Sequence, residues 1–586
     1  MLEQSTVFEN SRNSALLIPV DHIPLTTTPS ELADQLQSGV AVDTPSQSAG
    51  SAEPKLNPRK NASGHSSYIN TLAILMATCL NALPWLVDGA VWLGVIGVIL
   101  ALWLSTRVGF TSSLLVTWLW CTCSVGIAFH WSPATMAYTL SSGIGLGILV
   151  AAPLIMWDGL RMALGYWIAA RVTKDIRYQW LAAATCAIFL EYTMPGVFPW
   201  KMGCVLLPIP WTIQAVDIFG PSFSTLVVFA IAGMIQISAR AIWIACRFEK
   251  NGRDTHARLS TILLSPALVF LTLNFVYNGL AWSYWQSQSE SAKKVRLGLI
   301  QVDPSYKESP ARLQEFTASI GNQVDLICWP ESSGGNYELQ LDNFSDSDRV
   351  FRMSRSPARG LRPWPNPKCE VLLAGKNYVG DPDQPEQLFV TAMLVDCSES
   401  IVARYNKRFL MPFGEYVPCK DFVPGLTELF DMDEQIQPGS SCSSLASLTG
   451  ARIGTLLCYE DMVPKASRDA VAQNANLLIS LINGSAFESR FTISQHRQLA
   501  QMRALESRRY FARCASTGET CIVNPLGEIE SRLPVQTNGV LIGDVKLIEG
   551  RTIYSRFPWC LPIVGFGLLA IAFRFNSKSL FAKKIE

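Results

Sequence analysis

The sequence predicts a multi-pass α-helical membrane domain joined to an extracytoplasmic α/β domain. Hydrophobic residues make up 49% of the 586 residues and charged residues only 16%, whereas soluble domains typically carry about 25% charged residues. The deficit is concentrated in residues 67–285, where charges are sparse. Residues 290–550 instead show short β-rich runs alternating with helical and loop segments, which is typical of a layered α/β domain.

Apolar runs long enough to cross a bilayer recur along the chain, since a spanning helix needs roughly 17–25 residues. We place them at 68–87, 89–106, 109–130, 136–157, 178–198, 222–246, 260–283 and 557–574. The predicted organisation is a disordered cytoplasmic tail at 1–66, a seven-helix domain at 67–285, a catalytic domain at 290–550, a last span at 556–575 and a cytoplasmic tail at 576–586. The first tail is rich in Ser, Thr, Pro, Gln and Ala, which favours disorder.

Basic residues between the predicted spans indicate the orientation, because Lys and Arg concentrate in cytoplasmic loops. With a cytoplasmic N-terminus, the cytoplasmic side receives Arg107, Arg161 and the cluster at 247–258, while the opposite short loops carry little beyond Lys201. Seven spans then place the α/β domain outside the cytoplasm. Glu191 lies just inside the fifth predicted span, where a carboxylate is either functional or solvated at the headgroup level.

Composition also excludes several functions. A net charge of +1 argues against nucleic-acid binding, which normally requires a basic surface. Many of the 15 cysteines lie in apolar stretches and lack a paired metal-like spacing, so most are expected to be buried thiols. The five histidines form no cluster with cysteine, which argues against zinc. We expect neither a metal nor a cofactor.

Three segments of the α/β domain end in or contain a reactive side chain. The run VDLICWP leads directly into Glu331, RIGTLLCYE presents Cys458 and Glu460, and YNKRFLMPFGEYVP carries Lys407 and Glu415. Each residue alone has an ordinary structural interpretation. Because the ends of strands in α/β sheets are where catalytic groups gather, the sequence predicts that the three segments converge.

Together these side chains supply what a cysteine nucleophile requires. A nearby ammonium lowers the pKa of the thiol, a carboxylate can accept and return its proton, and the same ammonium can stabilise an oxyanion. A Cys–His site is the competing chemistry, but only His496 lies in the α/β domain, on a stretch that is predicted to be a structural helix.

At these residues the chain resembles the carbon–nitrogen hydrolase (nitrilase) superfamily and, more narrowly, the apolipoprotein N-acyltransferase family. The resemblance rests on WPES, YNKRFLMPFGEYVP and LCYED in the α/β domain. It also rests on FPW at 198–200 and on Ile213, Gln214, Asp217 and Gly220 in the membrane part. It implies an α-β-β-α sandwich and covers roughly residues 68–575.

By this resemblance Cys458 is the nucleophile, Lys407 the oxyanion-stabilising residue and Glu331 the general base, with supporting roles for Glu415, Tyr459 and Glu460. The implied reaction is a ping-pong transfer of an acyl chain from a phospholipid to the α-amine of an S-diacylglyceryl cysteine on an apolipoprotein. The implied location is the bacterial inner membrane, with the catalytic domain on the periplasmic side.

The sequence departs from the family pattern in places. INGSAFE (482–488) has Ala486 where the family commonly has Trp, and Ser516 replaces the Asn of an Asn-Thr-Gly motif. The apolar segment 418–432 is a hypothetical lid over Cys458 or an ordinary loop. The alternative function is a membrane-tethered nitrilase-type amidohydrolase, and a non-enzymatic lipoprotein-binding scaffold is a further possibility that the retained triad disfavours.

Overall fold

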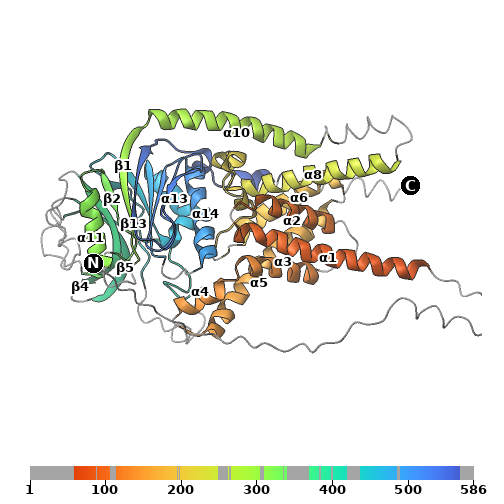
Figure 1. Cartoon of the computed structure of the whole chain (residues 1–586), viewed down its shortest axis with the longest axis horizontal. Coiled ribbons are helices and arrows are strands. Elements are labelled where there is room, and N and C mark those ends of the chain that lie inside the picture. The colour runs from red at the N-terminus through yellow and green to blue at the C-terminus, as the bar shows by residue number, and fades with distance from the viewer. Residues whose placement is uncertain are drawn as a thin grey trace, which may run out of the picture. The chain divides into compact units, whose positions relative to one another are not determined.

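The computed structural model describes residues 58–565 and 567, apart from 88, 106–113, 141, 174, 195, 197, 249–261, 263–264, 304–308, 334–335, 339–368, 382–383, 397–399, 419–435, 485–488 and 566. Residues 58–291 form a helical region and residues 293–547 form an α/β domain (Figure 1). The tail at 1–57, residues 568–574 of the last predicted span and residues 419–432 of the proposed lid lie outside the described residues.

The described part of the helical region consists mainly of apolar helices. In chain order its described elements are α1 (Pro58–Leu86), α2 (Val91–Ser105), α3 (Leu114–Ala128), α4 (Ser132–Thr139), α5 (Ile144–Val172), α6 (Ile176–Thr193), η1 (Met202–Leu206), η2 (Pro210–Ile213), α7 (Val216–Phe219), α8 (Phe223–Phe248) and α10 (Pro266–Ser291). Many of their apolar side chains are exposed, such as Leu149 and Leu280. Exposed apolar surface of this extent on helices is expected where lipid replaces water.

Two described helices, α5 and residues Phe223–Ile244 of α8, are long and apolar enough to cross a membrane. The pair α3 and α4, bent by 64°, is a third candidate if it forms one span, and α1 and α2 contain shorter apolar stretches. The predicted fold class of apolar helices that could span a membrane, followed by an α/β domain, is confirmed. The number of spans and the orientation stay predictions.

The structure corrects the position of Arg161, which was expected in a cytoplasmic loop. Arg161 lies inside α5, where its guanidinium is buried, pairs with Asp158 at 3.0 Å and donates to the carbonyl of Met194 at 3.2 Å. Helix α5 continues to Val172, so Arg161 lies within a helix and not in a loop. Asp158 neutralises Arg161 one helical turn away, so the helix can continue past it.

The α/β domain contains two packed sheets. The first has the order β13-β1-β2-β4-β5-β6 with β3 beside β4, and the second has the order β12-β11-β10-β9-β8-β7. The strands of the first sheet are β1 (Lys293–Gln301), β2 (Leu326–Cys328), β3 (Asn336–Glu338), β4 (Glu370–Asp381), β5 (Gln384–Val395), β6 (Ile401–Asn406) and β13 (Gly539–Leu547). Those of the second are β7 (Leu445–Ala446), β8 (Arg452–Leu457), β9 (Leu477–Ile482), β10 (Phe511–Ala515), β11 (Cys521–Val523) and β12 (Ile529–Arg532).

Helices cover the sheets on their outer faces, giving α-β-β-α layers (Figure 1). Helix α11 (Ser309–Ile320) packs on the first sheet, and α13 (Pro464–Ala472) and α14 (Arg490–Ser507) pack on the second. Separate apolar clusters fill the space between the sheets and the space under each helical layer. The central strands β2, β8, β9 and β10 are buried almost throughout, which explains their continuous apolar sequences.

The helical region and the α/β domain share one apolar core. Met411, Met462 and Leu499 of the α/β domain lie in the same cluster as the buried side chains of α1–α8. Hydrogen bonds from Arg508 also connect the two parts of the chain. Arg508 follows α14 and has a left-handed φ of 52°. Its guanidinium donates to the Asp217 carboxylate at 2.9 Å and to the side chain and the carbonyl of Gln214, both at 2.7 Å. The Gln214 and Asp217 positions of the sequence motif therefore hold the two parts of the chain together.

Candidate functional site

Cys458 lies at the carboxyl end of β8, where the chain turns into the short helix η4 (Cys458–Met462). Its φ of 47° is in the left-handed region, which a residue with a Cβ adopts at a cost of about 1–3 kcal/mol. Ser332, which follows Glu331, and Phe413, which lies within the segment 405–418, also have positive φ values, of 64° and 61°. Strained backbone in all three segments is typical of a functional site held in shape by the surrounding fold.

Lys407 lies just after β6 and is almost completely buried. Its ammonium donates to Glu415 Oε1 at 2.6 Å and to Glu331 Oε1 at 3.4 Å. The other oxygen of Glu331 accepts from the backbone N–H of Asn483 at 3.2 Å, and the other oxygen of Glu415 accepts from the backbone N–H of Met411 at 2.8 Å. The structure thus brings Glu331 together with Lys407 and Glu415, which both lie on the segment 405–418.

Glu460 fixes the turn of Cys458 to the segment that carries Lys407. The carboxylate accepts from the backbone N–H groups of Leu457, Arg408 and Phe409 at 2.8–3.0 Å and from the Tyr405 hydroxyl at 2.7 Å. Four donors satisfy a buried carboxylate, so this contact sets where the ammonium lies relative to the thiol. Tyr459 differs from its neighbours, because it packs into the apolar cluster shared with the helical region.

The net effect of burial and of the charges around Cys458 is to raise the pKa of the thiol, whereas the sequence predicts that a nearby ammonium lowers it. Burial raises the pKa of the Cys458 thiol well above its usual value and Glu331 raises it further, while the Lys407 ammonium only opposes the shift. The expected lowering effect of the Lys407 ammonium is present, but burial and Glu331 outweigh it, so the net pKa shift of the thiol is upward. A base beside Cys458 would therefore help to form the thiolate.

Glu331 is suited to act as that base. Burial raises the pKa of Glu331 above that of an ordinary carboxyl group, against the lowering effect of Lys407. Burial also acts to lower the pKa of Lys407, but the carboxylates of Glu331 and Glu415 outweigh it, so the net shift is well upward. The site therefore contains a fixed cation, a carboxylate that is more basic than usual and a neutral thiol.

These opposing influences predict the reactivity of Cys458 toward iodoacetamide at pH 8. Replacing Glu331 with Gln is expected to increase the alkylation rate several-fold, because a carboxylate that raises the thiol pKa is removed and each pKa unit changes the thiolate fraction about tenfold. Replacing Lys407 with Met is expected to decrease it. Peptide mass spectrometry of the labelled protein measures both rates, with Cys442 as the internal control. Equal rates at Cys458 in the wild type and both variants would contradict this electrostatic account.

Asn483 was not among the predicted site residues, although it belongs to the site. It follows β9 and donates its backbone N–H to Glu331, and its carbonyl oxygen lies 3.9 Å from the Cys458 sulfur. The sequence signal was its position at the end of a buried strand beside the Cys458 strand. The neighbouring departure at Ala486 lies outside the described residues.

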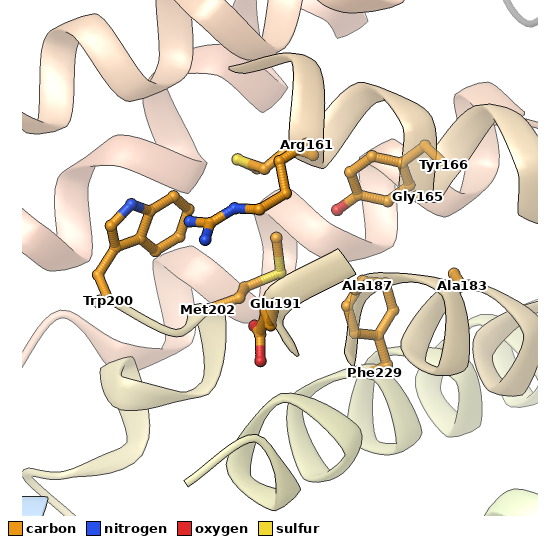
Figure 2. A pocket seen from close by; sticks show the side chains of 10 residues that line it. Arg161, Gly165, Tyr166, Ala183, Ala187, Glu191, Trp200, Met202 and Phe229 are labelled. Carbon is orange, nitrogen blue, oxygen red and sulfur yellow. The ribbon is translucent and has the colours of Figure 1, made fainter. Parts of the chain in front are cut away.

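The helical region has a separate buried polar group around Trp200 of the FPW motif. The Trp200 ring lies 5.2 Å from the guanidinium carbon of Arg161 and donates its N–H to Asp158 at 3.0 Å (Figure 2). Glu191 accepts from Thr225 at 3.0 Å, and its second oxygen lies 4.0 Å from the Lys201 ammonium. Arg161, Glu191 and Trp200 line a cavity of about 20 Å³, which is about the size that a water molecule needs. The FPW loop is therefore anchored to α5 by its tryptophan.

Comparisons with known proteins address both parts of the chain. The carbon–nitrogen hydrolase family model matches residues 296–553. A protein of Geobacter metallireducens named apolipoprotein N-acyltransferase is 26% identical over 76% of this chain and 78% of its own length. The chain is therefore similar to apolipoprotein N-acyltransferases along most of its length, and its α/β domain is similar to carbon–nitrogen hydrolases. Family members from Haemophilus ducreyi (22% identical, 86% of this chain and 96% of the relative) and Pseudomonas aeruginosa (35% identical, 50% and 55%) also match.

The names of these relatives and the match to the carbon–nitrogen hydrolase model confirm the prediction of an acyltransferase-type enzyme with a carbon–nitrogen hydrolase domain. Among solved structures, an amidase from Nesterenkonia sp. AN1 with a covalently modified active-site cysteine matches 46% of this chain and 95% of the amidase, with 19% identity and a TM-score of 0.33.

Proposed function

We propose that this chain transfers an acyl chain from a phospholipid to the α-amine of the S-diacylglyceryl cysteine of an apolipoprotein, through a thioester on Cys458. The observation that carries the proposal is the buried Lys407 ammonium, held between Glu331 and Glu415 beside the turn of Cys458. Names of the relatives and the apolar helices support lipid-linked substrates.

In the first half-reaction Glu331 removes the proton from Cys458 as the sulfur attacks the ester carbonyl of the phospholipid. The carbonyl oxygen gains negative charge, and the Lys407 ammonium is positioned to stabilise it. The ester C–O bond then breaks, and Glu331 returns its proton to the leaving lysophospholipid alcohol. Cys458 is left as a thioester.

In the second half-reaction the lipoprotein amine attacks the thioester carbonyl and gives a proton to Glu331. The C–S bond breaks and the proton returns to the sulfur, which regenerates the neutral thiol. Glu415 keeps Lys407 in place throughout, because it accepts the shorter of the two hydrogen bonds of the ammonium. The raised pKa of Glu331 makes this carboxylate basic enough to carry the proton in both steps.

A cavity in the helical region supports a lipid as the acyl donor. An apolar cavity of about 420 Å³ lies between α3, α4, α5 and Phe198, with Asp158 as its ionisable wall residue. The FGEYVP loop approaches α4, since a side chain added at Gly414 would lie 3.2 Å from Thr139. We further propose that the protein resides in the inner membrane with the α/β domain on the periplasmic side, where both lipid-anchored substrates are found.

Mass spectrometry of Cys458 tests the proposal. Incubating the wild type with phosphatidylethanolamine vesicles should add the mass of one acyl chain to the peptide containing Cys458 and release lysophospholipid. Cys458→Ala should show neither product, whereas Cys442→Ala, a cysteine outside the triad, should behave as the wild type does. A wild-type protein that gains no acyl mass but hydrolyses a small amide would favour the membrane-tethered amidohydrolase instead. A binding scaffold would retain its function in Cys458→Ala.

A further inference from the structure

Helix α14 is a polar helix that is buried along almost its whole length. From Thr492 to Ser507 every residue except Ser494 is buried, including His496, three glutamines and two arginines. Burying so many polar groups is unfavourable unless each finds a partner. The partners of α14 lie on two sides, in the helical region and in the α/β domain.

Gln495 faces the helical region and makes three hydrogen bonds there. Its amide nitrogen donates to the carbonyls of Trp85 and Ala128, both at 2.9 Å, and its amide oxygen accepts from the Trp131 ring N–H at 3.0 Å. These carbonyls end α1 and α3, and Trp131 precedes α4. One side chain thus binds together the ends of three membrane-region elements.

His496, the next residue, faces the nucleophile turn. Its Nε2 lies 2.6 Å from Asp461 Oδ1, and Asp461 belongs to the same short helix η4 as Cys458. The other Asp461 oxygen accepts from the Ser480 hydroxyl at 3.1 Å and from Arg513 at 3.4 Å. Adjacent residues on a helix point about 100° apart. One turn of α14 can therefore contact the helical region through Gln495 and the η4 turn through His496.

We propose that Gln495 and His496 are positioning residues that fix the Cys458 turn at a set place relative to the ends of α1, α3 and α4. Arg508 secures the other end of the same helix to Gln214 and Asp217. The inference rests on the proposed function. The distance of the Cys458 thiol from the membrane surface matters only when the acyl donor is held in a bilayer. A donor that diffuses freely in water can reach the thiol at any distance from the membrane surface.

The decisive variant is Gln495→Met, which keeps the size of the side chain and removes its hydrogen bonds. We expect thioester formation from phosphatidylethanolamine vesicles to fall about tenfold or more. Acylation of Cys458 by water-soluble p-nitrophenyl acetate and its alkylation by iodoacetamide should stay within about twofold of the wild type. The matched control is Thr492→Val, because the buried Thr492 hydroxyl on the same helix has no partner among the described residues. This control should leave all three rates unchanged.

A second pair of variants tests the link from α14 to the turn. His496→Gln can still donate to Asp461 and should retain most of the phospholipid reaction, whereas His496→Leu cannot and should lose it. Equal losses with phospholipid and p-nitrophenyl acetate in Gln495→Met would overturn the proposal, as would a wild-type rate with phospholipid. If the wild type itself reacts with p-nitrophenyl acetate but never with phospholipid, the proposed function fails, and the positioning role fails with it.

Discussion

Replacing Lys407 with Met is expected to reduce thioester formation on Cys458 by about a thousandfold. The ammonium is positioned to stabilise the oxyanion, and removing one such group typically costs 10²–10³ in rate. The substitution also leaves Glu331 and Glu415 buried without their shared cation, so one of them must take up a proton and Glu331 becomes a poorer base. Rapid-quench measurement of acyl-enzyme formation from phospholipid would determine the rate.

Lys465→Met is the matched control, since Lys465 is an exposed lysine paired with Asp469 on the outer helix α13. Its rate should equal that of the wild type. A Lys407→Met protein that forms the thioester within tenfold of the wild-type rate would show that another group stabilises the oxyanion.

Replacing Arg508 with Met is expected to destabilise the folded protein by roughly 3–5 kcal/mol. Breaking a buried ion pair from one side leaves the other charge uncompensated, and Asp217 would keep only the Tyr277 hydroxyl and the Trp285 N–H. Both Gln214 oxygen atoms would also lose the hydrogen bond that Arg508 donates, although the carbonyl oxygen would keep the one at 3.4 Å from the backbone N–H of Asp217. The thermal unfolding midpoint in detergent should therefore fall markedly.

A double substitution separates loss of the ion pair from loss of packing. Arg508→Met combined with Asp217→Asn should be more stable than Arg508→Met alone, because no unpaired charge stays buried. Arg177→Met removes an exposed ion pair to Asp175 and should change stability by no more than about 1 kcal/mol. If Arg508→Met and Arg177→Met had equal thermal unfolding midpoints, the contacts of Arg508 with Asp217 and Gln214 would contribute little to the stability of the fold.

The strands that could be predicted from sequence are those buried on both faces. The apolar runs at 451–460, 475–483 and 511–517 predict strands, and β8, β9 and β10 lie within these three ranges. Strand β13 was not predicted, because only three of its nine residues are buried and the rest are polar or half-exposed. Its identity depends on its antiparallel partner β1, which lies more than two hundred residues earlier in the sequence.

The end of α14 is a second feature that could not be predicted from the local sequence. The sequence predicts a helix at 494–512, whereas the helix ends at Ser507 and β10 begins at Phe511. Helices commonly end at a left-handed Gly or Asn, and here Arg508 adopts that conformation because its guanidinium is held by Asp217 and Gln214. A distant contact, rather than a local signal, determines where the helix stops.

The candidate site was predictable in its residues but not in its electrostatics. Motif spacing identified Glu331, Lys407, Cys458 and Glu415, whereas the upward pKa shift of the thiol arises from burial, which the local sequence does not reveal. The position of Arg161 was predictable in principle, because Asp158 three residues earlier indicates an intrahelical pair. Counting every arginine as a loop residue led to the wrong assignment.

The pairing of β1 with β13 places Lys293 opposite Leu547, so the chain enters and leaves the α/β domain through neighbouring strands. A globular unit whose two ends lie side by side can be inserted between consecutive segments of another protein without stretching either one. Helix α10 leads directly into β1, and α15 (Ile553–Arg556) follows soon after β13. This geometry lets the α/β domain occupy the interval between α10 and α15 without separating the ends of these two elements.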